Sequence, residues 1–93
     1  MAFYDLPKNE RTERIGLIMK DIWSGIEKNK LSPILEYFSD EDTYIRKTAY
    51  QAVGKIYFAN RNLQTKIVSI LGKLIKEKEP KVRQTVVNSA GEI

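Results

Sequence analysis

Three neighbouring carboxylates, at Asp40, Glu41 and Asp42, are the densest group of side chains in this sequence that could do chemistry. Their oxygens could in principle hold a hard cation such as Ca²⁺. A calcium loop, however, spreads its ligands over roughly twelve residues around a central glycine, and this cluster has neither feature. Asp42 is also a good helix N-cap, because its carboxylate can accept from backbone N–H groups two or three residues on. We therefore interpret the cluster as a helix cap and a solvated loop, and we expect no metal site.

The residue types that most enzymes need are missing. The chain has no histidine and no cysteine, which removes the usual general base and the commonest metal ligands. Its five glycines are isolated from one another, so they form no glycine-rich phosphate loop. We therefore expect no catalytic residues and no cofactor, and we predict that the protein is not an enzyme.

Lys66, Lys73 and Lys76 are the one basic group with a regular spacing. Steps of seven and three residues return to nearly the same angle on a helix, which places the three lysines on one polar face. Such a face is often no more than a solubilising surface. A stripe that binds phosphate groups or an acidic partner is the alternative.

Charge is unevenly distributed along the 93 residues. Residues 1–42 carry six Lys or Arg against nine Asp or Glu, whereas residues 43–83 carry ten against two. A basic half can attract nucleic acid or an acidic protein, although it can equally be a solvated surface. The sequence shows no apolar run long enough for a bilayer and no signal peptide, and without cysteine nothing indicates an oxidising compartment. We expect a cytoplasmic protein that does not enter membranes.

Apolar residues recur at helical spacing throughout, and no segment alternates as a strand would. The pattern predicts a first helix that starts near residues 5–8, with Pro7 in its first turn, and a short second helix after Ser32 and Pro33. A third helix is expected over about residues 43–57, a fourth over about 63–75, and a fifth after Glu79 and Pro80. The apolar residues of these patterns, in chain order, are Ile15, Ile18, Met19, Ile22 and Ile26; Leu31, Ile34, Leu35, Tyr37 and Phe38; Ile45, Ala49, Ala52, Val53 and Ile56; Leu63, Ile67, Ile70, Leu71, Leu74 and Ile75; and Val82, Val86, Ala90 and Ile93. We predict that these residues form the inner faces.

The chain repeats itself at an offset of 37 residues. Asp-Thr-Tyr-Ile-Arg-Lys-Thr-Ala-Tyr-Gln-Ala-Val-Gly-Lys-Ile, residues 42–56, aligns with Glu-Pro-Lys-Val-Arg-Gln-Thr-Val-Val-Asn-Ser-Ala-Gly-Glu-Ile, residues 79–93. Arg46 meets Arg83 and Gly54 meets Gly91. A fixed period of this length in helical sequence is typical of stacked helix pairs.

An acidic cap, an arginine four residues later, a run of small residues and then Gly-x-Ile resemble the first helix of a HEAT repeat. Both copies of the 37-residue pattern carry these elements. The resemblance implies an all-α fold, a right-handed superhelix of HEAT-like helix pairs. Residues 1–93 would be one domain with repeats at about 5–39, 40–77 and 78–93, the last incomplete, as the N-terminal fragment of a longer array.

The resemblance also implies roles for individual residues. Arg46 and Arg83 would be structural, bridging to acidic residues of a neighbouring loop such as Asp40, Asp42 or Glu79. Gly54 and Gly91 would let helices of adjacent pairs approach closely. The second helix of each pair would line the concave, partner-binding side, which makes the Lys66, Lys73 and Lys76 face the candidate binding stripe.

A HEAT-like array of this kind implies a noncatalytic scaffold that binds proteins. The alternative is the N-terminal part of a HEAT-like nucleic-acid-binding or DNA alkylation repair protein. In either case the fifth helix would lack the second helix of its pair. We therefore expect Val82, Val86, Ala90 and Ile93 to form an uncovered apolar stripe that favours self-association.

Overall fold

The predicted apolar stripes fall on five α-helices in a computed structural model that describes residues 2–93. The helices are α1 (Lys8–Glu27), α2 (Ser32–Phe38), α3 (Thr43–Ala59), α4 (Gln64–Leu74) and α5 (Pro80–Glu92), with single 3₁₀ turns η1 (Phe3–Asp5) and η2 (Arg61–Leu63). The described part of the chain contains no strand, so the all-α class is confirmed. The right-handed superhelical arrangement stays a prediction. Within residues 2–93, no helix combines the length and the apolar character needed to cross a bilayer.

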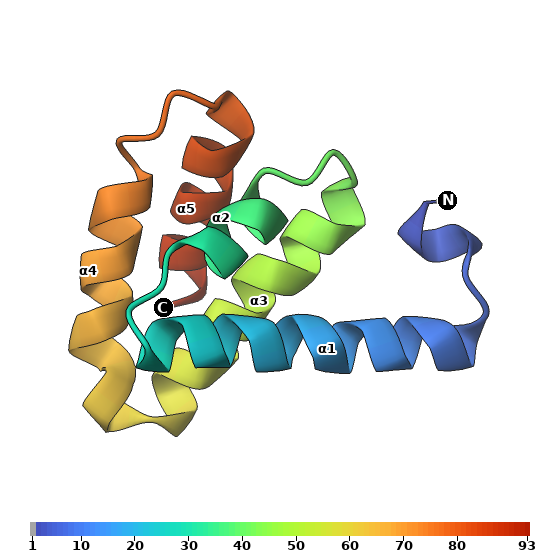
Figure 1. The fold of residues 1–93 in the computed structure, drawn as a ribbon, viewed down its shortest axis with the longest axis horizontal. Helices are drawn as coiled ribbons and strands as arrows, with labels where there is room; N and C mark the ends of the chain where they lie inside the picture. Colours follow the sequence, from blue (N-terminus) through green and yellow to red (C-terminus); the bar gives the residue numbers. More distant parts are fainter. Residues whose placement is uncertain (1) are drawn as a thin grey trace.

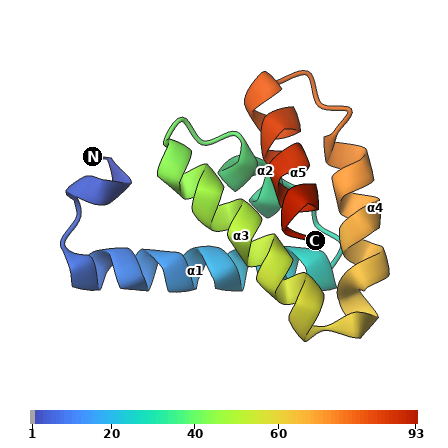
Figure 2. The same ribbon diagram turned by 180° about the vertical axis from the view of Figure 1, so that it is seen from behind.

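Helix α3 is the centre of the fold. It contacts each of the other four helices and crosses the molecule between α1 and α5 (Figures 1 and 2). Its predicted inner face is confirmed as fully buried, and the small residues Ala49 and Ala52 on that face let neighbouring helices approach. The Cα radius of gyration of 12.5 Å is close to the roughly 12 Å expected of a compact domain of this length.

Helix α1 divides into a packed half and a projecting half. Ile18, Ile22 and Ile26 are at most 1% exposed, whereas Ile15, predicted on the same stripe, is 42% exposed. The prediction for Ile15 is wrong because the N-terminal half of α1 extends past the other helices, as Figures 1 and 2 both show.

The turn between α1 and α2 explains why α1 ends where it does. Asn29 adopts a left-handed conformation with φ 55°, which asparagine tolerates better than most residues. The Asn29 N–H donates to the Ile26 carbonyl at 3.2 Å, and the Lys30 N–H donates to the Gly25 carbonyl at 2.8 Å. This is the Schellman pattern, and it satisfies carbonyl groups that the end of a helix would otherwise leave without donors.

Helix α5 packs against α3 and also contacts α2 and α4. Its inner face combines Val82 and Val86 with two buried hydroxyls, Thr85 and Ser89. Thr85 Oγ1 lies 2.7 Å from the Lys81 carbonyl and 3.2 Å from the carbonyl of Phe38 in α2, while Ser89 Oγ donates to the Thr85 carbonyl at 2.9 Å. The buried hydroxyls are therefore satisfied mainly by the helix that carries them.

The predicted uncovered stripe on the fifth helix needs correction. Val82 and Val86 are 0% and 5% exposed, because α5 lies in the angle formed by α2, α3 and α4. Ala90 and Ile93, nearer the end of α5, are exposed. The prediction of an uncovered stripe is therefore wrong for Val82 and Val86, whereas Ala90 and Ile93 are exposed as expected.

Candidate interaction surface

The loops before α3 and α5 are built in the same way. Asp42 Oδ1 accepts from the Tyr44 N–H at 2.9 Å, and Glu79 Oε1 accepts from the Lys81 N–H at 3.2 Å, so each acid caps the helix that follows it. Arg46 Nη1 donates to the Asp40 carbonyl and Arg83 Nη1 to the Glu77 carbonyl, in each case six residues earlier.

The two arginines bind main-chain carbonyls where the resemblance implied acidic side chains. Arg83 Nη1 lies 2.8 Å from the Glu77 carbonyl and 2.7 Å from that of Lys78, while Arg46 Nη2 adds a 3.2 Å hydrogen bond to Thr43 Oγ1. A guanidinium presents several N–H groups in a fixed plane, which suits loop carbonyls that have no helical donor. Both arginines thus fold the preceding loop back onto the start of the helix.

Gly54 marks the closest approach between α3 and α5. A Cβ at this position would lie 2.8 Å from the Cβ of Glu92, a distance that real side chains do not adopt. Gly91, its counterpart 37 residues later, is in open space: a Cβ there would have no neighbour within 4 Å among residues 2–93 apart from its own helix and chain neighbours. The structure therefore places Gly54 in a helix contact and Gly91 outside one.

Gly91 belongs to an exposed surface that we call the outer face of α5, formed by Val87, Ala90 and Gly91. Val87 is 61% exposed, while Tyr50, its counterpart on α3, is half-buried. The outer face of α5 thus holds the repeat-equivalent of Gly54, where α3 meets α5, but nothing among residues 2–93 covers it in the same way.

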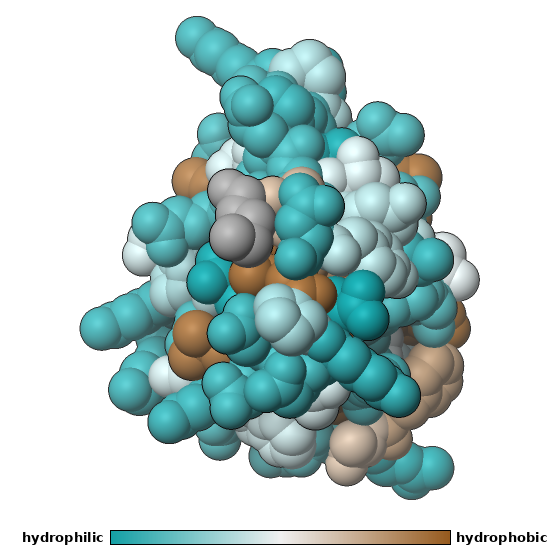
Figure 3. Space-filling view, turned by 90° about the vertical axis from the view of Figure 1, so that its right-hand side faces the viewer, coloured by the Kyte–Doolittle hydropathy of each residue, from teal (hydrophilic) through white to brown (hydrophobic). Residues whose placement is uncertain are grey.

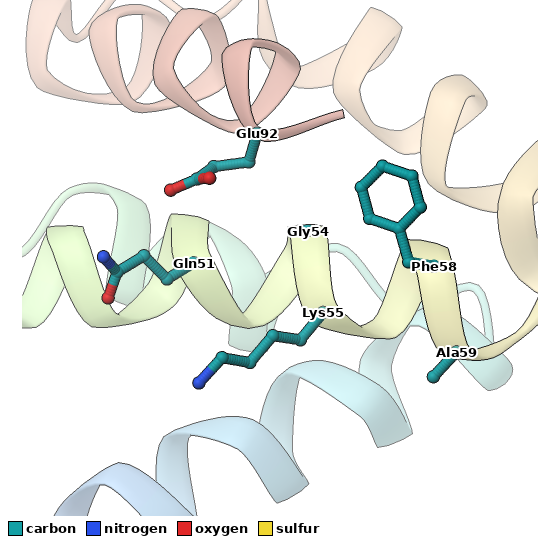
Figure 4. Close-up of a pocket in the computed structure, with 6 residues that line it drawn as sticks. All are labelled: Gln51, Gly54, Lys55, Phe58, Ala59 and Glu92. Carbon is teal, nitrogen blue, oxygen red and sulfur yellow. The ribbon is translucent and has the colours of Figure 1, made fainter.

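A groove lies beside the contact between α3 and α5. It has a volume of about 690 Å³ and is lined by Gln51, Gly54, Lys55, Phe58, Ala59 and Glu92. Figure 4 shows that Phe58 and Glu92 flank it from α3 and α5, with Lys55 and Gln51 farther along α3. Its lining mixes the aromatic ring of Phe58 with an amide, an amine and a carboxylate; of these, the aromatic ring is the feature enriched at protein interfaces.

The three lysines of the candidate binding stripe do not form one free basic face. Lys66 Nζ donates to the carbonyl of Glu27 at the end of α1, at 3.0 Å, so this lysine caps another helix. Lys73 lies in the last turn of α4 and Lys76 lies beyond its end, and both are exposed. The predicted common face required all three lysines to lie on one helix, but α4 ends at Leu74, before Lys76.

The N-terminal segment forms a structure that sequence reasoning missed. Residues 2–6, which we call the N-terminal hook, fold back over the start of α3 (Figure 1). The Phe3 ring is 6% exposed and the Phe3 N–H donates to Asp42 Oδ2 at 2.7 Å. Tyr4 meets Tyr44 edge to face, with ring centroids 4.2 Å apart. Viewed from this end, the surface is mainly hydrophilic with small separate hydrophobic areas (Figure 3).

Two of the three residues of the acidic cluster, Asp40 and Asp42, use their carboxylates to accept backbone hydrogen bonds. Asp40 Oδ1 accepts from the Asp42 N–H at 2.8 Å, and both oxygens of Asp42 accept backbone N–H groups. The hydrogen bond from Phe3 is the main cause that lowers the pKa of Asp42, with a further contribution from Tyr44. Within residues 2–93, no three His, Cys, Asp or Glu side chains are grouped so that they could hold a metal ion.

A second buried polar contact joins α1 to α2. The Tyr37 hydroxyl donates to Asp21 Oδ2. Burial, followed by this hydrogen bond to a carboxylate, raises the pKa of Tyr37 to about 12. The pair thus joins α1 to α2 through one side-chain hydrogen bond.

Comparison with known proteins places most of the chain in one family. Residues 22–93 match the model of a family described as non-SMC mitotic condensation complex subunit 1. This match covers residues 22–27 at the end of α1 and all of α2 to α5, and it supports the helical-repeat class at a coarse level. The search of curated proteins and the search of solved structures each found no match.

Proposed function

We propose, from the premise that this chain belongs to the family of non-SMC mitotic condensation complex subunit 1, that it is a noncatalytic helical scaffold that binds proteins. In this proposal α1 to α5 follow the HEAT pattern, with helix pairs at about residues 5–39 and 40–77 and the first helix of a third at 78–93. The family description names a subunit of a complex, which supports protein partners. The cytoplasmic location stays a prediction.

The observation that carries the proposal is the pair Gly54 and Gly91. Gly54 permits a helix to approach α3, and α5 occupies that place. Gly91 provides the same small surface on α5, next to the exposed Val87 and Ala90. Scaffolds of stacked helices bind partners through such exposed helix faces, because one helix face can accept another with little rearrangement.

The first partner to test for the outer face of α5 is a second copy of this chain. Residues 1–42 are acidic on balance and residues 43–83 are basic, so two copies in a head-to-tail arrangement present opposite charges to each other. Sedimentation velocity over a range of concentrations measures this association. We expect the full chain to self-associate and Val87→Glu to be monomeric.

Val68→Glu is the matched control, since Val68 on α4 is exposed to a similar degree, 58%, and lies away from α5's outer face. It should associate as the unchanged protein does. A folded monomer at every concentration tested, or equal loss of association in both variants, would contradict the proposed role of this surface.

Nucleic-acid binding is the second candidate function, favoured by the basic residues 43–83. Lys73 and Lys76 are free to contact phosphates, whereas Lys66 is engaged by Glu27. If this function is real, single-stranded or duplex DNA should bind with an affinity that falls steeply as salt is raised. Replacing Lys73 and Lys76 with glutamine should then reduce the slope of that salt dependence. If the protein does not bind DNA at low salt, this function is ruled out.

A further inference from the structure

The N-terminal hook is held by very few contacts. Phe3 is its one buried residue; Ala2, Tyr4 and Asp5 are exposed, and Leu6 is half-buried. One hydrogen bond, from the Phe3 N–H to Asp42, and one ring contact, from Tyr4 to Tyr44, join it to α3. The Arg11 guanidinium of α1 also lies over the Tyr4 ring, 5.0 Å from its centroid, and the Phe3 ring packs against the hydrophobic core. The hook therefore sits on its surface much as a short bound peptide would.

The surface under the hook is formed mainly by the start of α3, with Arg11 and Arg14 of α1 beside it. We call it the hook seat and define it by Asp42, Tyr44 and Ile45, at the first turn of α3. Asp42 Oδ1 accepts the capping hydrogen bond from the Tyr44 N–H, which leaves Oδ2 to accept from the hook. A cavity of about 290 Å³, lined in part by Phe3, Asp42 and Ile45, continues beside the ring.

The hook and its seat also differ in their relation to known proteins. The seat lies inside residues 22–93, which match the condensation-subunit family, whereas the hook lies outside that range. The seat is thus part of the shared domain, and the segment that fills it here lies outside the match.

We propose that the hook seat is a binding site for a short aromatic segment of a protein partner, and that the N-terminal hook is its intramolecular competitor. The proposal rests on the proposed scaffold role only in that the partner is a protein. The chemistry of the hook defines the chemistry of the partner: an aromatic ring to fill the place of Phe3 and a free main-chain N–H to donate to Asp42. A second aromatic residue directly after the first would pack on Tyr44, as Tyr4 does.

Competition follows from the covalent link. A segment joined to its site by a short connection acts at an effective concentration of about millimolar, so a free peptide must overcome it. Removing the Phe3 ring frees the site while leaving Asp42, Tyr44 and Ile45 unchanged. A partner segment should therefore bind the hook-free protein more tightly than the unchanged one.

An acetylated peptide with the sequence Ala-Phe-Tyr-Asp-Leu, as in residues 2–6, is the probe. It is titrated into the full chain and into Phe3→Ala while the amide signals of Tyr44 and Ile45 are followed by NMR. We expect binding to Phe3→Ala to be tighter by at least about tenfold. The same peptide with alanine in place of its phenylalanine should not bind, and Val68→Ala, which removes an exposed apolar side chain on α4, should behave as the unchanged chain.

A second measurement covers the case in which Phe3→Ala does not fold. In the full chain with 4-fluorophenylalanine at position 3, excess peptide should move the fluorine signal from its buried to its solvent position. Equal peptide affinity for the full chain and for Phe3→Ala, or a fluorine signal that excess peptide leaves in place, overturns the proposal. If the fluorine signal shifts with protein concentration in the absence of peptide, the proposal is also overturned, because the hook of a second copy would then occupy the hook seat. The outer face of α5 takes no part in these assays, so their failure leaves the sedimentation test unaffected.

Discussion

Residues 42–56 and residues 79–93 carry one pattern, yet the two copies have different surroundings. The first copy, in α3, is covered by α1 on one side and α5 on another, and its cap also holds the N-terminal hook. The second copy, in α5, meets α3 but leaves its outer face exposed. The pattern therefore encodes the local helix start, and the neighbours decide what each position contributes.

The largest expected difference lies at the two caps. Asp42→Ala removes a helix cap and also the charged acceptor of the Phe3 N–H, so we expect it to lower the free energy of unfolding by about 2–3 kcal/mol. Glu79→Ala removes one cap alone and should cost about 0.5–1 kcal/mol. Urea unfolding followed by circular dichroism measures both. Equal losses would show that the hook adds nothing to the stability of α3.

Gly54 and Gly91 give the next contrast. Gly54→Ala puts a Cβ against Glu92 and should destabilise the protein by about 1–2 kcal/mol, even after the gain in helix propensity. Gly91→Ala meets open space and should be neutral or stabilising by up to about 1 kcal/mol. The two melting temperatures measure the contrast. A gain at both positions would mean that α5 shifts freely away from α3.

Arg46 and Arg83 should differ less, because their contacts are alike. Arg46→Lys should lower the free energy of unfolding by on the order of 1 kcal/mol, since one ammonium group does not reproduce the planar set of donors. Arg83 is more exposed, and Arg83→Lys should cost about half of that or less. An unchanged melting temperature for Arg46→Lys would show that Arg46 does not have this structural role.

The smallest effect is a pH dependence of the first cap. The pKa of Asp42 is lowered in the folded protein, mainly by the Phe3 hydrogen bond, so the ionised carboxylate stabilises the fold above its ordinary pKa. This stabilisation is lost as the pH falls below that ordinary value and through the lowered one. The stability difference between the unchanged chain and Asp42→Asn should therefore shrink between about pH 5 and pH 2. A difference that does not change with pH would exclude Asp42 as the titrating group.

Helix positions and most of the core could be predicted from the sequence, because apolar spacing decides which face of a helix is buried. The hook could not, since Phe3 lies in a short segment before Pro7 and belongs to no periodic stripe. The burial of Val82 and Val86 was missed for another reason. Helix spacing identifies an apolar face but does not say which neighbour covers it, and here α2, α3 and α4 together do so.

The interactions at the candidate sites were predicted less well than the helices. Lys66 was assigned to a binding stripe because of its spacing along α4, but its partner is a carbonyl 39 residues earlier in the chain. The two arginines were expected to contact acidic side chains, but they bind loop carbonyls. A sequence pattern does not show a main-chain acceptor, since every residue carries the same carbonyl group.

The buried hydroxyls of α5 have a consequence for how the molecule opens. Thr85 and Ser89 bond to carbonyls of their own helix, so those bonds survive when α5 moves away from α3. Val82 and Val86 then lose apolar cover, together with the surfaces of α2, α3 and α4 on which they pack, whereas global unfolding also exposes the rest of the buried face of α3. Opening of α5 therefore costs less free energy than global unfolding. In native-state hydrogen exchange, the amides of α5 should become deuterated before those of α3, as a separate cooperative unit.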